Sequence, residues 1–311
     1  MTLDISVIIP AYNAARWLGR ALDSVVAQTL RPREVIVVDD GSTDETAAVA
    51  ARYAPVVTCI RQTNGHVSAA RNRGAAEATG EWLAFLDADD EWFPDKLERQ
   101  AAILRRHPDL AWCCCNCVVL RSGRNSARII PPTVERGLRR EARVSFFEAA
   151  AGGLSLQTSG FVLHRGLFEE AGGFDIGLKR QEDRDLWWRI AFRHAHVGYD
   201  ARPLYRYYAD TAGSLGKVGQ DRTDVIENIC KHARSVQTYG PAVAADFRRY
   251  ARPLVADYLL RAAGGLVRIS PGAVLEASRL FPPSGYQRLL TATVGLLPRP
   301  IARRMVHRLC R

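Results

Sequence analysis

Short apolar runs alternate with segments of helical periodicity along the first hundred residues. The apolar runs predict buried strands over residues 6–9, 34–38, 56–60 and 81–86. Apolar positions three and four apart predict a helix over 14–29, and we expect further helices over 46–53, 68–78 and from Pro94 to about 106. Short strands between helices are typical of a parallel sheet covered on both faces. We therefore expect an α/β fold whose ligands bind beyond the carboxyl ends of the strands.

The alternation is less regular after residue 108. The later elements that we expect are a strand over 111–120, a loop over 121–143, a short strand over 161–164 and a helix over 185–193. From about residue 220 the pattern is mainly helical, with expected breaks at Pro241, Pro271, Pro282–Pro283 and Pro298. This change predicts an α/β domain over 1–215 and a helical C-terminal extension over 216–311.

The composition indicates a globular, basic chain. Hydrophobic residues make up 47% and charged residues 24%, which allows a substantial core. The formal net charge of +10 favours an anionic partner, such as a phosphorylated substrate, nucleic acid or an anionic membrane surface. We expect no nucleic-acid partner, because the chain has no recognised binding module and no basic stripe interleaved with aromatic residues.

The start and the tail of the chain bear on localisation. No signal-peptide pattern opens the sequence and no transmembrane-length apolar run occurs in it, so we expect a cytoplasmic protein. In the tail, basic residues such as Arg299, Arg303 and Arg304 lie among apolar ones. Two alternatives follow: a basic amphipathic helix, peripheral on the inner face of the cell membrane, or a helical subdomain with a solvated basic face.

Seven cysteines are present, an odd number without the spacing of a disulfide framework. Four of them fall within the run Cys113–Cys117, where metal binding is the alternative to simple burial. Adjacent residues of a strand point to opposite faces, so these thiols cannot all reach one ion. We expect them to be small buried residues of a strand.

An acidic cluster, Asp87-Ala88-Asp89-Asp90, follows the fourth predicted strand. Mg²⁺ and Mn²⁺ bind carboxylates together with substrate phosphates. In an extended chain, residues two apart point the same way, so we expect Asp87 and Asp89 to share one ion. The alternative is a helix N-terminus near Pro94, where acids complement the dipole. That role accounts for one or two of the acids but not for three.

Two further acidic motifs each allow two interpretations. Asp39–Asp44 is either a solvated turn in which Ser42 or Thr43 caps the next helix or a site where a carboxylate accepts a hydrogen bond from a nucleotide base. Glu182-Asp183 is either the start of an amphipathic helix or the position of a general base. Neither a Gly-x-Gly-x-x-Gly nor a Walker A pattern follows the first strand, which excludes the usual dinucleotide-dehydrogenase and P-loop classes.

Several motifs occur together in one order. They are Ser6–Asn13, Val37–Asp44, Asn64-Gly65 with Ala70–Gly74, Phe85–Asp90 with Pro94, Lys96 and Leu97, then Gly172–Asp175 and Glu182-Asp183. Each motif is weak alone, but their order and spacing over residues 3–215 resemble the family 2 glycosyltransferases. The resemblance implies a GT-A fold, which is a Rossmann-like nucleotide-binding sandwich with a mostly parallel central sheet. It also implies inverting transfer of a sugar from a nucleotide-diphosphate sugar to an acceptor hydroxyl.

The resemblance further implies roles for individual residues. Asp183 matches the catalytic base, and Asp89 and Asp87 match the ligands of a divalent metal, Mn²⁺ or Mg²⁺, with Asp89 the direct ligand. The residues expected at the nucleotide sugar are Pro10, Tyr12, Asn13, Asp39, Asp40, Arg71, Asp87, Ala88, Asp89, Glu182 and Arg206. We expect a glycan or lipid-linked acceptor, since bacterial cell-surface polysaccharide or lipid-linked glycan synthesis is the common role of the family.

One position departs from the family pattern. Family members often carry Arg-x-His near the end of the catalytic domain, whereas this chain has Arg206-Tyr207-Tyr208. In the family this histidine lies near the metal and the diphosphate, so its replacement by Tyr208 is expected to affect metal affinity. A second hypothesis therefore stays open: a catalytically inactive homologue that binds nucleotide sugar. Hydrolysis of a donor in the presence of Mn²⁺ distinguishes the two hypotheses.

Overall fold

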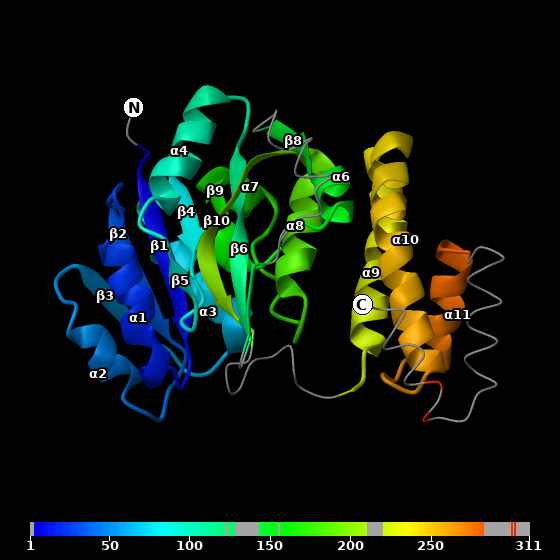
Figure 1. Ribbon diagram of the computed structural model, residues 1–311, viewed down its shortest axis with the longest axis horizontal. Helices are drawn as coiled ribbons and strands as arrows, with labels where there is room; N and C mark the ends of the chain where they lie inside the picture. Colours follow the sequence, from blue (N-terminus) through cyan, green and yellow to red (C-terminus); the bar gives the residue numbers. More distant parts are fainter. Residues whose placement is uncertain are drawn as a thin grey trace. The chain divides into compact units, whose positions relative to one another are not determined.

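The computed structural model describes residues 3–121, 124–127, 143–154, 156–209, 220–282, 300 and 302. The chain divides into two compact units, Met1–Ser214 and Leu215–Arg311. Figure 1 shows the first unit as a sheet with helices against it and the second as a group of helices.

The first unit is built on a mixed sheet. Its strands are β1 (Ile5–Ala11), β2 (Glu34–Asp39), β3 (Val57–Arg61), β4 (Trp82–Phe85), β5 (Glu91–Trp92), β6 (Trp112–Arg121), β7 (Arg124–Ala127), β8 (Arg143–Ser145), β9 (Val162–His164) and β10 (His196–Tyr208). Their order is β3-β2-β1-β4-β9-β6-β10-β5, and β7 and β8 pair with β6 and β10. Strands β1 to β4, β6 and β10 share one direction, which confirms the mostly parallel sheet.

Strands β5, β7, β8 and β10 were not predicted, and β9 was predicted without its pairing. Strand β9 runs antiparallel between β4 and β6, a pairing that its short apolar run does not reveal. Strand β7 falls within 121–143, which we expected to be a loop; the rest of that stretch from 122 onward lies outside the described residues, apart from Arg143 in β8. The residues of β7 are mostly polar and pair with β6 through the backbone, so apolar periodicity gave no signal.

Helices cover both faces of the sheet. Those of the first unit are α1 (Ala15–Val26), α2 (Thr46–Ala51), α3 (His66–Glu77), α4 (Lys96–Arg106), α6 (Phe146–Ala151), α7 (Arg165–Glu170), α8 (Glu182–Arg193) and the short 3₁₀ helix η1 (Thr158–Gly160). Val7 and Ile9 of β1 share a core with Leu22 of α1. Ile8 faces α3, where a Cβ on Gly74 would lie 2.4 Å from Ile8 Cγ2, so this close approach requires glycine.

Aromatic side chains fix α8 in place. The rings of Phe161 and Trp187 stack with centroids 3.9 Å apart, and the ring of Trp112 lies 6.0 Å from that of Phe161. Aromatic pairs of this kind add about 0.5–1.5 kcal/mol to the effect of burial. The layer therefore holds the start of α8, which carries Glu182 and Asp183, in a defined position.

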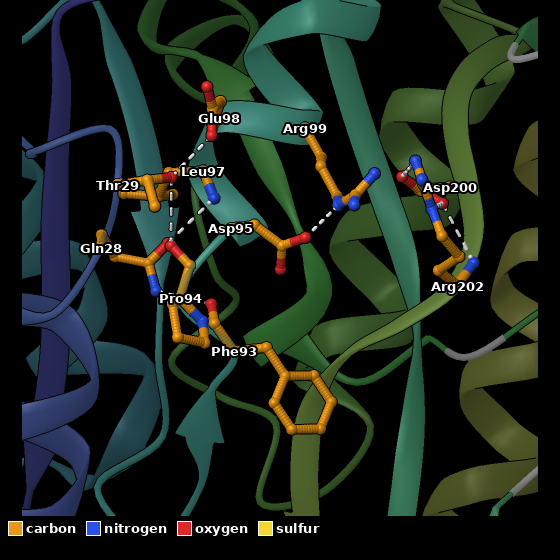
Figure 2. A network of polar contacts seen from close by, with 10 residues as sticks. All are labelled: Gln28, Thr29, Phe93, Pro94, Asp95, Leu97, Glu98, Arg99, Asp200 and Arg202. Carbon is orange, nitrogen blue, oxygen red and sulfur yellow. Dashed lines mark hydrogen bonds and ion pairs between the residues drawn. The ribbon is translucent and has the colours of Figure 1, made fainter.

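The chain that follows α1 anchors the start of α4, as Figure 2 shows. Gln28 Nε2 donates to the carbonyl of Phe93 at 2.7 Å, and Gln28 Oε1 accepts from the amide of Leu97 at 3.0 Å. The hydroxyl of Thr29 donates to Glu98 Oε2 at 2.8 Å. Because these bonds fix the chain just after the acidic cluster, they also restrict the position of that cluster.

The cysteines of β6 behave as predicted. Cys113, Cys114, Cys115 and Cys117 are all 0% exposed. Burial raises the pKa of Cys115 to about 12, so that thiol stays protonated near neutral pH. The prediction of small buried strand residues is confirmed.

The second unit contains helices α9 (Thr223–Ser235), α10 (Pro241–Ala263) and α11 (Pro271–Leu280) and the 3₁₀ helix η3 (Val236–Tyr239). Buried side chains of the three α-helices include Ile226, Phe247 and Ala277. Pro241 and Pro271 lie in the first turns of α10 and α11, so these prolines begin helices as well as separating them. The predicted helical character is confirmed.

The tail bears on membrane contact. The arginines at 299, 303 and 304 lie outside the described residues. Of the helices that the structure describes, none combines the length and the apolar character needed to span a membrane.

Candidate functional site

The loops after β1 and β2 are joined through Asn13. Its amide donates to Ser42 Oγ at 2.9 Å, and its Oδ1 accepts from the amide of Thr43 at 2.9 Å. Asn13 has a φ of 48°, a left-handed conformation that asparagine adopts more readily than most residues. The predicted cap by Ser42 or Thr43 is wrong, because α2 follows Glu45, and the side chain that accepts from its first amide, Thr46 N, at 3.0 Å is that of Asp44. The hydroxyls after β2 bind the neighbouring loop instead.

Asp39 and Asp40 are buried at the end of β2, with exposed fractions of 0% and 3%. Asp39 Oδ1 accepts from the amide of Ser42 at 2.9 Å, and Oδ2 lies 3.6 Å from Arg61 Nε. Asp40 Oδ1 accepts from the amide of Gly65 at 2.8 Å. The interpretation of a solvated turn is therefore wrong for both carboxylates, which instead fix the loops around them.

Pro10 and Tyr12 lie at the end of the central strand β1. Pro10 is buried inside the strand, whereas Tyr12 follows it and is 53% exposed. Ligands of such sheets bind beyond the carboxyl ends of the strands. The ring of Tyr12 therefore offers an accessible face for stacking on a planar group at that edge.

Arg71, on α3, bridges the acidic cluster and the start of α8. Its Nη2 lies 2.6 Å from Asp87 Oδ1, and its Nη1 lies 2.9 Å from Glu182 Oε1. The ring centroid of Phe174 lies 5.0 Å from the guanidinium carbon. Burial alone would lower the pKa of Arg71, but the two carboxylates raise this pKa above its ordinary value. Arg71 therefore remains charged and joins two distant segments of the chain.

Residues Asp87 to Asp90 form a turn, because the amide of Asp90 donates to the carbonyl of Asp87 at 3.0 Å. The premise of an extended chain, from which we expected Asp87 and Asp89 to point the same way, is therefore wrong. Asp90 is 0% exposed, and its Oδ2 accepts from Ser159 Oγ at 2.6 Å. Burial, followed by the charges of Asp89 and Asp87, raises the pKa of Asp90 well above its ordinary value. Asp90 is an internal anchor of the turn.

Asp183 lies in the first turn of α8 and is partly buried. Burial, and then the negative charge of Glu182, raises the pKa of Asp183 to about 7. Its Oδ1 accepts from the amide of Arg184 at 2.6 Å. A carboxylate with a pKa near neutrality can take up a proton at working pH, as a general base must. Since α8 begins at Glu182, the interpretation as a helix start is confirmed, whereas the role of general base stays a prediction.

Arg206 lies near the end of β10 and contacts the chain that follows the acidic cluster. Its Nη1 lies 2.6 Å from Glu91 Oε1, and its guanidinium carbon lies 4.5 Å from the ring centroid of Phe93. The hydroxyl of Tyr208 donates to the other oxygen of Glu91 at 3.0 Å. Pairing of β10 with β5 brings these residues together.

The donor set for a metal ion is small. Among the described residues, no group of three or more His, Cys, Asp or Glu side chains is arranged to hold an ion. One oxygen of Asp87 is paired with Arg71, and Asp89 is partly exposed. One or two carboxylates fit an ion that completes its coordination with water and substrate phosphates, as Mg²⁺ usually does. They do not fit an all-protein metal site.

Sequence reasoning missed two residues that position the site. Ser159 is 0% exposed, and its Oγ accepts from the amide of Asp87 at 3.1 Å while it donates to Asp90. Asn72 holds the loop before α8, since its Nδ2 donates to the carbonyl of Phe174 at 2.8 Å and its Oδ1 accepts from the amide of Phe174 at 2.9 Å. Asn72 lies inside the motif Ala70–Gly74, so the sequence could have indicated it as a site residue. Ser159 lies outside all of the motifs.

The sheet and the acidic turn at its edge define a GT-A glycosyltransferase fold. The family model described as Glycosyl transferase family 2 matches residues 6–155. The putative glycosyltransferase EpsE of Bacillus subtilis (strain 168) is 30% identical over 214 residues, which are 67% of this chain and 73% of EpsE. The chain belongs to glycosyl transferase family 2.

A further relative agrees with this assignment, and two solved structures share the fold. An uncharacterized glycosyltransferase of Rickettsia prowazekii (strain Madrid E) is 31% identical over 208 residues, 65% of this chain and 63% of that protein, so the chain spans less than two thirds of this relative. TarS 1-349 of S. aureus, in complex with UDP-GlcNAc, gives a TM-score of 0.69 at 19% identity, covering 98% of this chain and 90% of that one. The mannosyltransferase PcManGT from Pyrobaculum calidifontis, in complex with GDP-Man and Mn²⁺, gives 0.59 at 21% identity, covering 99% and 85%. The predicted GT-A fold is confirmed.

Proposed function

We propose that this chain transfers a sugar from a nucleoside-diphosphate sugar to an acceptor hydroxyl, with inversion at the anomeric carbon. The Arg71 bridge carries the proposal, because it brings the start of α8, with Asp183, beside the acidic turn that contains Asp89. A base close to the diphosphate end of the donor is what a single displacement requires. Family membership supports glycosyl transfer, and the ligands named for the two solved structures support a nucleotide-sugar donor.

The nucleotide binds at the carboxyl ends of β1 and β2. Tyr12, which is 53% exposed, stacks on the base. Asp40, with Asp39 beside it, accepts a hydrogen bond from a base N–H. Pro10 and Asn13 hold the loop that carries the tyrosine, and the bond from Asn13 to Ser42 keeps this loop against the end of β2.

The diphosphate lies beside the acidic turn. Asp89, with Asp87 next to it, would hold Mn²⁺ or Mg²⁺ together with phosphate oxygens, and the bound ion supplies Lewis-acid neutralisation of the leaving group. Arg71 fixes Asp87, and Ala88 is only 7% exposed, so the turn keeps a compact shape. Arg206 adds positive charge near the leaving group and is itself held by an ion pair with the chain after the turn.

Asp183 accepts the proton of the acceptor hydroxyl while the hydroxyl oxygen attacks the anomeric carbon. The new C–O bond forms on the face opposite the departing nucleoside diphosphate, so configuration inverts in one displacement. The pKa of about 7 keeps a large fraction of Asp183 ionised at neutral pH. Glu182 is paired with Arg71, which leaves Asp183 as the base of the two adjacent carboxylates.

The acceptor is a glycan or lipid-linked saccharide in bacterial polysaccharide synthesis, and the chain works in the cytoplasm at the inner face of the membrane. The net charge of +10 supports contact with an anionic surface. Arg248, Arg249 and Arg252 of α10 are exposed and supply part of that charge. Flotation with phosphatidylglycerol vesicles, but not with phosphatidylcholine vesicles, is expected for the wild-type chain and not for a variant with these arginines replaced by glutamine. Equal flotation of both chains would contradict the role of α10.

A screen of UDP- and GDP-sugars with Mn²⁺ tests the main proposal. The chain is expected to release nucleoside diphosphate from at least one donor, and NMR of the product is expected to show the anomeric configuration opposite to that of the donor. Retained configuration would rule out inversion. A donor that binds without being hydrolysed or transferred would favour the inactive homologue.

A further inference from the structure

Arg20, on α1, lies between the acidic turn and the end of β10. Its Nη2 donates to the carbonyl of Asp89 at 2.6 Å. Its guanidinium carbon lies 3.7 Å from the ring centroid of Tyr208. Arg20 Nε is buried and has no hydrogen-bond partner among the described residues. The guanidinium is therefore held on one side by a backbone carbonyl and on its face by an aromatic ring.

Tyr208 contacts three successive residues of the acidic segment, one of them through Arg20. Its amide donates to Asp90 Oδ1 at 3.2 Å, and its hydroxyl donates to Glu91 Oε2 at 3.0 Å. Its ring supports Arg20, which binds Asp89. Side chains from α1 and β10 thus meet at the segment that follows β4.

The contacts of Arg20 act on the middle of the turn. Arg71 and Ser159 already hold its two ends, through Asp87 and Asp90. A guanidinium is planar, and its attraction to an aromatic ring is directed at the ring face. The ring of Tyr208 therefore sets the plane of Arg20, and Arg20 in turn sets the orientation of the peptide that follows Asp89.

We propose that Arg20 and Tyr208 are positioning residues that fix the direction in which the Asp89 carboxylate meets the donor diphosphate and its ion. This inference deepens the proposed function and rests on it. The part of Tyr208 that we expect to matter is its ring, because the guanidinium of Arg20 packs against the ring face. The hydroxyl reaches Glu91, which Arg206 also binds, at 2.6 Å.

Four variants separate ring, hydroxyl and charge. Tyr208→Leu removes the ring face, whereas Tyr208→Phe keeps it and loses only the hydroxyl. Arg20→Gln removes the cation that binds Asp89. Arg16→Gln is its matched control, because Arg16 is an exposed arginine on the same helix. Melting temperatures of all four confirm that each variant folds before binding is compared.

The first measurement is calorimetric binding of UDP and GDP, each with Mn²⁺ and with EDTA. Tyr208→Leu and Arg20→Gln are expected to lower the ratio of the affinities with and without Mn²⁺ by about tenfold or more. Tyr208→Phe and Arg16→Gln are expected to keep the wild-type ratio. An unchanged ratio in Tyr208→Leu, or an equal loss in Tyr208→Phe, would overturn the inference.

The second measurement needs no ligand and separates this inference from the proposed function. Hydrogen exchange of a peptide covering residues 86–92 is expected to be faster in Tyr208→Leu and Arg20→Gln than in the wild type, and unchanged in Tyr208→Phe. Equal exchange in all chains would overturn the positioning role. Failure of the wild type to bind any nucleoside diphosphate would instead overturn the proposed function, and the exchange result would still decide whether Arg20 and Tyr208 hold the turn.

Discussion

Arg71 and Glu182 lie 111 residues apart in the sequence and form a buried ion pair in which Nη1 is 2.9 Å from Oε1. The same guanidinium holds Asp87 at 2.6 Å. A buried charge is tolerated when opposite charges and hydrogen bonds replace its hydration. The position of Asp183 beside the acidic turn therefore depends strongly on one arginine side chain.

Replacing Arg71 by methionine leaves two carboxylates without their cation. We expect a loss of about 3–5 kcal/mol in the free energy of unfolding, as when one partner of a buried pair is removed. Arg73→Met is the matched control on the same helix, because Arg73 forms an exposed pair with Glu77, and such pairs contribute about 0–1 kcal/mol. Urea unfolding followed by tryptophan fluorescence measures both losses. Equal losses in the two variants would show that the buried pairs of Arg71 contribute no more to stability than the exposed pair of Arg73.

The raised pKa of Asp183 predicts a pH-dependent stability. The pKa is about 7 in the folded chain and 3.8 for an ordinary aspartate, so between these values the folded state binds more protons than the unfolded state. Stability then falls as pH rises through this window. Asp183→Asn removes this titration. The melting temperature of the variant minus that of the wild type should therefore increase as pH rises from about 4 to about 8. A difference that does not change with pH would contradict the shift.

The buried Lys96 predicts that stability rises with pH in the alkaline range, opposite to the effect of Asp183. Lys96 is 0% exposed, and its Nζ donates to Gln100 Oε1 at 2.7 Å. Burial lowers the pKa of Lys96 from 10.5 to about 8, so between these values the unfolded state binds more protons and stability rises with pH. The melting temperature of the wild type minus that of Lys96→Met should therefore increase as pH rises from about 8 to about 10. Parallel melting curves of the two chains over that range would rule out a buried, titrating lysine.

Tyr12 is expected to matter for binding and not for folding. Since it is 53% exposed, Tyr12→Ala should change the free energy of unfolding by less than about 0.5 kcal/mol. Stacking on a base contributes about 1–3 kcal/mol, so binding of UDP or GDP should weaken by about fivefold or more in the same variant. Tyr12→Phe keeps the ring and should bind as the wild type does. Calorimetry that finds unchanged binding in Tyr12→Ala would remove this residue from the site.

Much of the fold could be predicted because its main signals are local. Strands β1, β2 and β4 are mainly apolar runs, and helix α1 between the first two repeats apolar residues at helical spacing. The place of β9 between β4 and β6 could not be predicted, because the pattern of a strand does not specify its partner. The mostly polar β7 gave no apolar signal at all.

The site was predictable in its parts but not in its connections. The acidic motifs at Asp39–Asp40 and Asp87–Asp90 follow strands, so their common edge of the sheet could be inferred. The two partners of Arg71 lie 16 and 111 residues away, and no local pattern indicates such pairs. The sequence showed that Tyr208 departs from the family pattern, but only the structure shows that its ring carries Arg20.

The central claim is that Asp183 takes the proton of the acceptor. The most direct measurement compares Asp183→Asn with the wild type for both donor affinity and transfer, using a donor that the wild type turns over. Transfer should fall by about 10²–10⁴-fold, the usual contribution of a general base, while the Kd for the donor stays unchanged. Transfer at the wild-type rate, or a donor affinity that falls as much as transfer does, would contradict the assignment of Asp183 as the base.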